Sequence, residues 1–152
     1  MKGFEATIDG TTATLKVSGP IDETCEFPTT VKCEKLIIDF EKLTVFNSYG
    51  IRLWIIWSKA LTVKTVELVN CRPTFIKQTQ HIPDLIPPSA HVKSFYVPYF
   101  DVDADKGVEV KLEAGKDFTE AGLTLSAPPT NAAGKPLELD VVADKYFAFL
   151  KR

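Results

Sequence analysis

The stretch FNSYG contains the residues with the clearest chemical potential. Asn47 and Ser48 follow an apolar pair and precede a run with helical periodicity. Such side chains are favoured at helix N-termini because they bond free backbone N–H groups. A hydroxyl at this position also lies beside the positive end of the helix, which stabilises a phosphate. Two interpretations therefore stay open: Asn47 and Ser48 only cap a helix, or Ser48 is a phosphorylation site.

A phosphate on Ser48 is expected to change binding more than folding. It adds about −1.5 to −2 charges at pH 7 and three acceptor oxygens. A helix N-terminus accommodates this charge, whereas a partner surface pressed against it meets a bulky anion. Phosphorylation here is therefore expected to switch a protein complex.

The cysteines and histidines do not form a catalytic or metal-binding set. Cys25, Cys33 and Cys71 lack metal-ligand spacing and are odd in number, so we interpret them as reduced, partly buried thiols. His81 and His91 are isolated, and neither lies near a serine or cysteine in a triad-like pattern. We therefore predict no catalytic residue, no metal site and no cofactor, and the chain is not expected to be an enzyme.

The run DVDAD places three carboxylates at alternating positions, Asp101, Asp103 and Asp105. A calcium loop of the EF-hand type also needs a glycine and a distal bidentate glutamate at set positions. Gly107 and Glu109 do not stand at those positions. We therefore predict a solvated turn between two strands.

Composition limits the classes of partner. The 152 residues carry a net charge of −2, and the Lys and Arg residues are scattered. A nucleic-acid binder needs a basic face to neutralise phosphates, so no nucleic acid is expected. The N-terminus is polar, and the longest apolar run, Ile51–Ile56, contains Arg52 and is too short to span a bilayer. We expect a soluble, cytoplasmic chain without membrane insertion.

Strand patterns dominate the first part of the chain. A hairpin turning at Asp9-Gly10 is followed by the polar segment Glu23–Glu34, which suits a loop or one helical turn. The continuous apolar run Lys35–Phe40 suits a central strand covered on both sides. Thr65–Val69 predicts a second buried strand.

Helix patterns alternate with these strands. One helix is expected from about Tyr49 to Ala60, and another begins at Arg72-Pro73 and extends toward Ile82. His91–Phe100 then predicts a third strand of the same sheet. The fold class predicted is α/β (α+β), a mixed sheet with helices on one side.

The last third of the chain has a different composition. Glu113–Ala133 is rich in Gly, Ala, Thr and Pro and resembles a loop, and Leu137–Val142 predicts a further strand. Asp144 is expected to cap a final helix whose aromatic residues pack back on the body. We therefore divide the chain into a domain of residues 1–97 and a β-rich extension of residues 98–152.

The order of these motifs resembles the STAS domain, the fold of sulfate transporters and anti-sigma-factor antagonists. The resemblance runs from Phe4 to Val97 and includes a G-x-I-D turn that ends at Asp22. It continues with a buried strand, the N-S-x-G stretch from Asn47 to Gly50, and a second strand and helix. It implies a mixed sheet backed by helices.

The resemblance also implies a role in bacterial signalling. Stand-alone members bind an anti-sigma-type serine kinase, which phosphorylates the serine of this motif and separates the complex, and a metal-dependent phosphatase restores binding. The matching serine is Ser48, which makes the chain a candidate phosphoprotein. The residues expected to contact the partner are Asp22, Asn47, Ser48, Tyr49, Gly50, Leu53, Ile56 and Trp57.

The chain departs from the family pattern near this serine. Asn47 replaces the usual Asp, which removes a carboxylate beside the hydroxyl. Tyr49 replaces a small residue, which either shields Ser48 or enlarges the contact surface. The loop before the central strand is also shorter than the helix that normally lies there.

Residues 98–152 resemble the zinc-ribbon-like extension of a narrower group of bacterial STAS-like proteins. Pro98-Tyr99-Phe100 and the final KYFAFL fit that pattern, but Asp101–Ala104 and Thr130–Ala133 stand where its cysteine pairs belong. Tetrahedral zinc needs Cys or His donors, and this segment has neither. The resemblance implies a metal-free ribbon whose knuckles are held by hairpin hydrogen bonds and aromatic packing.

The helix after Ser48 has two apolar stripes, of which one is spaced to pack on the sheet. That first stripe consists of Ile51, Trp54 and Ile55. The second consists of Leu53, Ile56, Trp57 and Ala60. Either the C-terminal extension covers the second stripe, or it is a partner site anchored by Trp57, which a second copy of the chain can share.

The leading hypothesis is a STAS-like protein-binding regulator of the anti-sigma-factor-antagonist type, switched at Ser48. One alternative is an accessory module of a transport system that binds a small molecule or lipid, for which a closed apolar cavity near Trp54 is expected. The other is a structural module that forms a homodimer through the helix.

Overall fold

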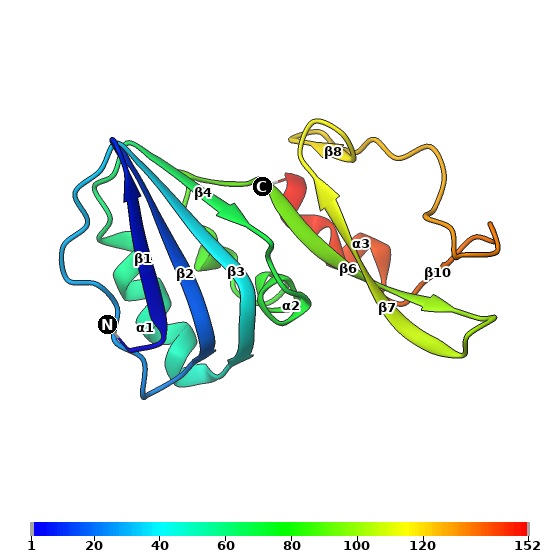
Figure 1. The fold of residues 1–152 in the computed structure, drawn as a ribbon, viewed down its shortest axis with the longest axis horizontal. Coiled ribbons are helices and arrows are strands. Elements are labelled where there is room, and N and C mark those ends of the chain that lie inside the picture. Colours follow the sequence, from blue (N-terminus) through cyan, green and yellow to red (C-terminus); the bar gives the residue numbers. More distant parts are fainter. Residues whose placement is uncertain (1, 152) are drawn as a thin grey trace.

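The computed structural model describes residues 2–151 and has the mixed α/β architecture that the sequence predicts (Figure 1). The larger sheet contains β1 (Phe4–Asp9), β2 (Thr12–Ile21), β3 (Lys35–Phe46), β4 (Thr65–Val69) and β5 (Ala90–Val92). Its helices are α1 (Ser48–Lys59), α2 (Pro73–Thr79) and the 3₁₀ helix η1 (Pro83–Leu85). The C-terminal part contains β6 (Ser94–Asp101), β7 (Lys106–Glu113), β8 (Phe118–Thr119), β9 (Gly122–Leu123), β10 (Glu138–Leu139), α3 (Ala143–Tyr146) and the 3₁₀ helix η2 (Ala148–Lys151).

The larger sheet has the strand order β1-β2-β3-β4-β5. β1 and β2 form the expected antiparallel hairpin, and Gly10 takes a positive φ of 63° in its turn. The remaining neighbours are parallel, with α1 connecting β3 to β4 and α2 lying between β4 and β5 in the chain. The period-2 pattern of β2 buries Leu15 and Val17, while Lys16 remains exposed.

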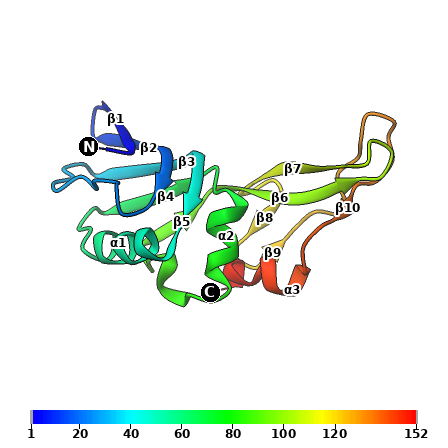
Figure 2. The same ribbon diagram turned by 90° about the horizontal axis from the view of Figure 1, so that it is seen from below.

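Helices cover only one face of this sheet (Figure 2). Leu36, Ile38 and Phe40 of β3 face the helices and are fully or almost fully buried. Ile37 and Asp39 point to the other face and are only half-buried. The prediction that Lys35–Phe40 is covered on both sides is therefore wrong. On this second face β3 is flanked by the charged residues Lys16 of β2 and Glu67 of β4, which keep the face in contact with water.

The predicted third strand divides between two sheets. Only Ala90–Val92 pairs with β4, whereas Ser94–Asp101 forms the centre of a second sheet with the order β10-β6-β7. The predicted single strand His91–Phe100 is therefore wrong, since the chain changes sheets at Lys93. The division drawn at residue 97 falls within β6.

The C-terminal part confirms the turn between β6 and β7 at residues 102–105. Leu137–Val142 forms only the short strand β10. Asp144 is not a cap: Val142 occupies the N-cap position of α3 and makes no side-chain cap hydrogen bond. Asp144 is the second residue of α3, so its carboxylate still lies near the positive end of the helix.

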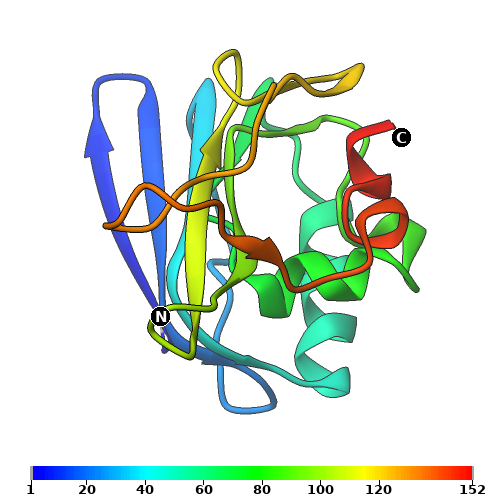
Figure 3. The same ribbon diagram turned by 90° about the vertical axis from the view of Figure 1, so that its right-hand side faces the viewer.

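The terminal aromatic residues pack back on the body, as expected. Tyr146 and Phe149 are buried, and the Phe149 ring lies 5.0 Å from that of Phe95 in an edge-on arrangement. Figure 3 shows this end of the chain on the same side of the molecule as α1 and α2. Apolar contacts with β6 therefore fix the C-terminus.

Arg72 joins the two sheets at their junction. Its guanidinium lies 4.3 Å from the centre of the Tyr96 ring of β6 and bonds both carboxylate oxygens of Glu109 on β7, at 2.6 and 3.2 Å. The Tyr96 hydroxyl donates to Glu41 of β3 at 2.8 Å. These contacts link side chains from both sheets.

Candidate functional site

Asn47 performs the capping at the start of α1. Its backbone is extended, and its Oδ1 accepts a hydrogen bond from the Gly50 N–H at 2.8 Å. Its Nδ2 donates to Glu23 at 3.0 Å. Ser48 is the first residue of the helix and is exposed. Its hydroxyl makes no hydrogen bond to another residue within 2–151, so the cap does not depend on it.

Gly50 brings the helix against the end of β2. A Cβ on Gly50 would overlap the carbonyl oxygen and carbon of Ile21, so only glycine fits. This close approach places Asp22 beside the helix N-terminus. The Asp22 carboxylate accepts from the Thr24 hydroxyl at 2.6 Å and from its N–H at 2.8 Å, and these bonds lower the pKa of Asp22.

An apolar surface extends from Ser48 along α1. Tyr49 and Ile56 are 54% and 59% exposed. A groove of about 490 Å³ lies between α1 and the end of α2 with the residues that follow it. Its lining residues are Ser48, Ile51, Arg52, Ile55, Ile56, Gln78 and Ile82. The wall formed by Gln78 and Ile82 was not predicted as part of the site, although the helical spacing of Ile82 was visible in the sequence.

The second stripe of α1 is covered by a segment that the sequence did not suggest. Trp57 is half-buried, donates from Nε1 to the Pro28 carbonyl at 2.8 Å, and stacks on Phe27 at 5.1 Å. We call residues 22–34 the covering segment. The cover therefore comes from this segment and not from the C-terminal extension. Leu53 is half-buried, which leaves Ile56 as the large exposed side chain of this stripe.

Two of the three thiols, Cys25 and Cys33, lie in the covering segment, and the Cys25 thiol donates to the Asp22 carbonyl at 3.1 Å. Burial raises the pKa of Cys71, which is fully buried, and of Cys25, so both are weak nucleophiles. Cys33 is half-buried. Within residues 2–151, His, Cys, Asp and Glu side chains form no group of three or more placed to hold a metal ion.

Side chains connect the loop at Asp101–Ala104 with the loop at Thr130–Ala133. Asn131 Nδ2 donates to Asp101 at 3.0 Å and to Asp103 at 2.8 Å, and the first bond lowers the pKa of Asp101. Lys135 adds an ion pair with Asp103 at 3.4 Å. An amide therefore joins the two loops at the positions where the zinc-ribbon pattern has its cysteine pairs.

Comparisons with protein-family models, with curated proteins and with solved structures found no match to this chain. The STAS domain therefore stays a resemblance carried by the motifs. None of the helices within residues 2–151 combines the length and the apolar character that a membrane span requires.

Proposed function

We propose that this chain is a STAS-like regulatory module that binds a protein partner at the N-terminal end of α1. The observation that carries the proposal is the exposed Ser48 hydroxyl. It does not cap the helix, because the Asn47 side chain accepts the hydrogen bond from the Gly50 N–H. The exposed Ser48 side chain can therefore contact a partner or a kinase without disturbing the helix.

The surroundings of Ser48 suit a contact with another protein. Exposed Tyr49 follows Ser48 directly, exposed Ile56 lies about two turns further along α1, and the apolar groove extends beside the helix. Amphipathic aromatic residues and apolar pockets are typical anchors of protein interfaces. Trp57 is not an anchor in this proposal, because Pro28 and Phe27 already engage its ring.

Phosphorylation of Ser48 is the proposed switch. Free N–H groups of the first turn and Arg52, one turn further on, favour a phosphate on the helix side. The negative charges of Glu23, which accepts from Asn47 Nδ2, and of Asp22 beside the helix N-terminus oppose it. A docked partner meets this added charge directly, so the complex weakens while the fold persists.

The partner class proposed is an anti-sigma-type serine kinase in the bacterial cytoplasm, with the chain acting as a binding protein and not as an enzyme. The kinase supplies the phosphoryl group, and this chain supplies the acceptor hydroxyl. A separate phosphatase resets the switch.

The test compares three variants for phosphate incorporation and for binding to a cognate kinase. Ser48→Ala should lose incorporation and keep binding, while Ser48→Asp should bind roughly tenfold more weakly, equivalent to about 1.4 kcal/mol. Ser126→Asp, on an exposed loop of the C-terminal part, is the matched control and should bind like the parent chain. Full binding by Ser48→Asp and Ser48→Ala alike contradicts the switch.

The ligand-binding alternative gains no support beside Trp54. This ring is 1% exposed and packs against Phe40, Phe75 and Trp57 at 5.5 to 5.8 Å between ring centres. Its Nε1 donates to the Leu85 carbonyl at 2.7 Å. Side chains therefore fill the space that a ligand there needs.

A further inference from the structure

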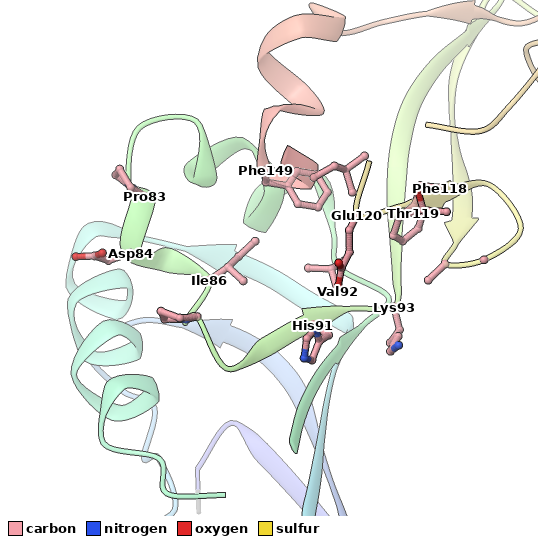
Figure 4. A pocket seen from close by; sticks show the side chains of 14 residues that line it. Pro83, Asp84, Ile86, His91, Val92, Lys93, Phe118, Thr119, Glu120 and Phe149 are labelled. Atoms are coloured by element: carbon pink, nitrogen blue, oxygen red, sulfur yellow. The ribbon is translucent and has the colours of Figure 1, made fainter. Parts of the chain in front are cut away.

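A cleft of about 690 Å³ opens where the two sheets meet, far from Ser48 along the chain (Figure 4). One wall follows η1 and includes Ile86, and the other is formed by the turn after β7 and the C-terminal η2. Sites for small molecules commonly measure roughly 300–1,000 Å³ and lie between structural units. The cleft therefore has the size and position of a ligand site.

Apolar side chains backed by the core form much of the walls. Ile86, Phe118 and Phe149 are 3%, 3% and 7% exposed, so their side chains are held by packing behind the surface. The Ala114 N–H donates to the Lys93 carbonyl at 2.9 Å and closes the base of the cleft. A ligand entering it thus meets preformed walls, which lowers the entropic cost of binding.

The Glu120 carboxylate reaches into this space. Figure 4 shows the Glu120 side chain extending from its turn toward Val92 of β5. Within residues 2–151, the Glu120 carboxylate makes no salt bridge or hydrogen bond. Asp84 at the rim differs, since Lys59 pairs with it at 3.1 Å.

His91 of β5 and Lys93, the residue after β5, also line the cleft, but their side chains face away from Glu120. His91 and Lys93 alternate with Val92 along the strand, so their side chains leave on the opposite face. The Lys93 N–H donates to Leu68 of β4 at 2.8 Å. The preceding Val92 carbonyl therefore points to the open edge of β5, toward the cleft. The cleft interior thus presents acceptors on apolar walls.

We propose that this cleft binds a small organic ammonium compound, an apolar ring or short chain carrying a protonated amine. The Glu120 carboxylate and the Val92 carbonyl accept hydrogen bonds from the ammonium group, and the apolar body lies against Ile86 and Phe149. Charge-assisted bonds of this kind are about twice as strong as neutral ones. The site is independent of the partner surface at Ser48.

The test uses three molecules of one shape: benzylamine, benzyl alcohol and benzoate. Titrations of the whole chain at pH 7, followed through the backbone amide signals of Val92 and Glu120, should give affinity for benzylamine about tenfold above that for benzyl alcohol. Benzoate should bind least. Preference for benzoate, equal affinity for all three, or absence of shifts at these amides overturns the proposal.

Glu120→Gln separates charge from shape. Glu120 is exposed on a turn, so the variant keeps the fold, and it should lower benzylamine affinity about tenfold while leaving benzyl alcohol unchanged. Glu138→Gln, which removes an exposed carboxylate on β10, is the matched control and should bind like the parent chain. Loss of benzylamine binding in both variants, or in neither, contradicts a role for Glu120.

Discussion

Gly50 and Ser48 stand two positions apart at the start of α1 and have opposite environments. Gly50 is buried against the Ile21 carbonyl, whereas Ser48 is exposed. The helix turn itself causes this difference, because the first turn directs one position toward β2 and another toward solvent. The sequence motif N-S-x-G thus contains one residue needed for close packing and one available for contact.

Gly50→Ala should destabilise the fold by about 2–4 kcal/mol, because the new Cβ clashes with backbone atoms of Ile21 that cannot move separately. Helix propensity acts in the opposite direction, favouring Ala by only about 1 kcal/mol. Urea unfolding monitored by tryptophan fluorescence measures the change.

Gly107→Ala is the control for this substitution. The nearest atom to a Cβ at Gly107 is the Tyr99 carbonyl oxygen at 3.9 Å, so the methyl group fits. Its effect should stay within about 0.5 kcal/mol. Equal stability of the two variants contradicts the close approach at Gly50.

Tyr96 should make stability depend on pH in the alkaline range. Burial, and then the hydrogen bond to Glu41, raise the pKa of Tyr96 to about 12, compared with about 10 in an unfolded chain. Between these values the folded state binds more protons, so stability is retained below pH 10 and falls as the pH rises toward 12.

Tyr96→Phe removes this titration and should flatten the decline in unfolding free energy between pH 10 and 12. Solvent screens the exposed hydroxyl, so the change should stay below about 1.4 kcal/mol per pH unit, the value for a fully buried group. The variant loses a hydrogen bond at every pH, so the slope is the quantity to compare. Parallel curves for the two proteins contradict the assignment.

At the scale of elements, α1 is held from two directions. The sheet packs against Trp54, and the covering segment packs against Trp57, which donates to Pro28. The sequence predicted the helix and both stripes because these follow from 3.6-residue periodicity. It did not predict the cover, because Phe27 and Pro28 lie in a segment without periodicity.

Trp57→Phe should destabilise the chain by about 1–2 kcal/mol, since the Pro28 carbonyl loses its donor and the ring contact shrinks. The loss should be greatest in the covering segment, where limited proteolysis should accelerate. Ile56→Ala is the neighbouring control: its side chain is 59% exposed, so stability should change by less than about 0.5 kcal/mol. Equal proteolysis rates in the parent chain and both variants would contradict the role of Trp57 in holding the covering segment.

At the scale of the whole molecule, the larger sheet and the sheet of β6 and β7 are connected in two ways. The chain passes from one to the other at Lys93, and the Arg72 side chain contacts Tyr96 and Glu109 of the second sheet. The Arg72 side chain is 26% exposed, and the bonds from its Nη2 to both Glu109 carboxylate oxygens limit its motion. Its stacking on Tyr96 adds an attraction that a surface ion pair lacks. The junction therefore combines covalent continuity with an Arg-centred contact.

A double-mutant cycle of Arg72→Met and Glu109→Gln should give a coupling energy of about 1 kcal/mol in urea unfolding. The exposed pair Lys135–Asp103, 3.4 Å apart, serves for comparison and should couple by less than about 0.5 kcal/mol. A coupling at Arg72 no larger than at Lys135 means that the junction depends on other contacts.

The sequence by itself determined the features that arise from near neighbours. The Asp9-Gly10 turn, the period of α1, the Asn47 cap and the placement of Ser48 at a helix end were all predicted, and the structure confirms each. Turn chemistry, capping and side-chain periodicity act over a few residues, so they are readable in a single chain.

Tertiary structure decided what depends on distant neighbours. The chain passes from one sheet to the other at Lys93, and Phe27 stacks on Trp57. The Asn131 side chain donates a hydrogen bond to Asp101. The cleft forms between η1 and the C-terminal turn. Each results from packing between segments that composition does not pair. The position of Ser48 is therefore a local property, whereas the surface around it and the cleft depend on how the two sheets are assembled.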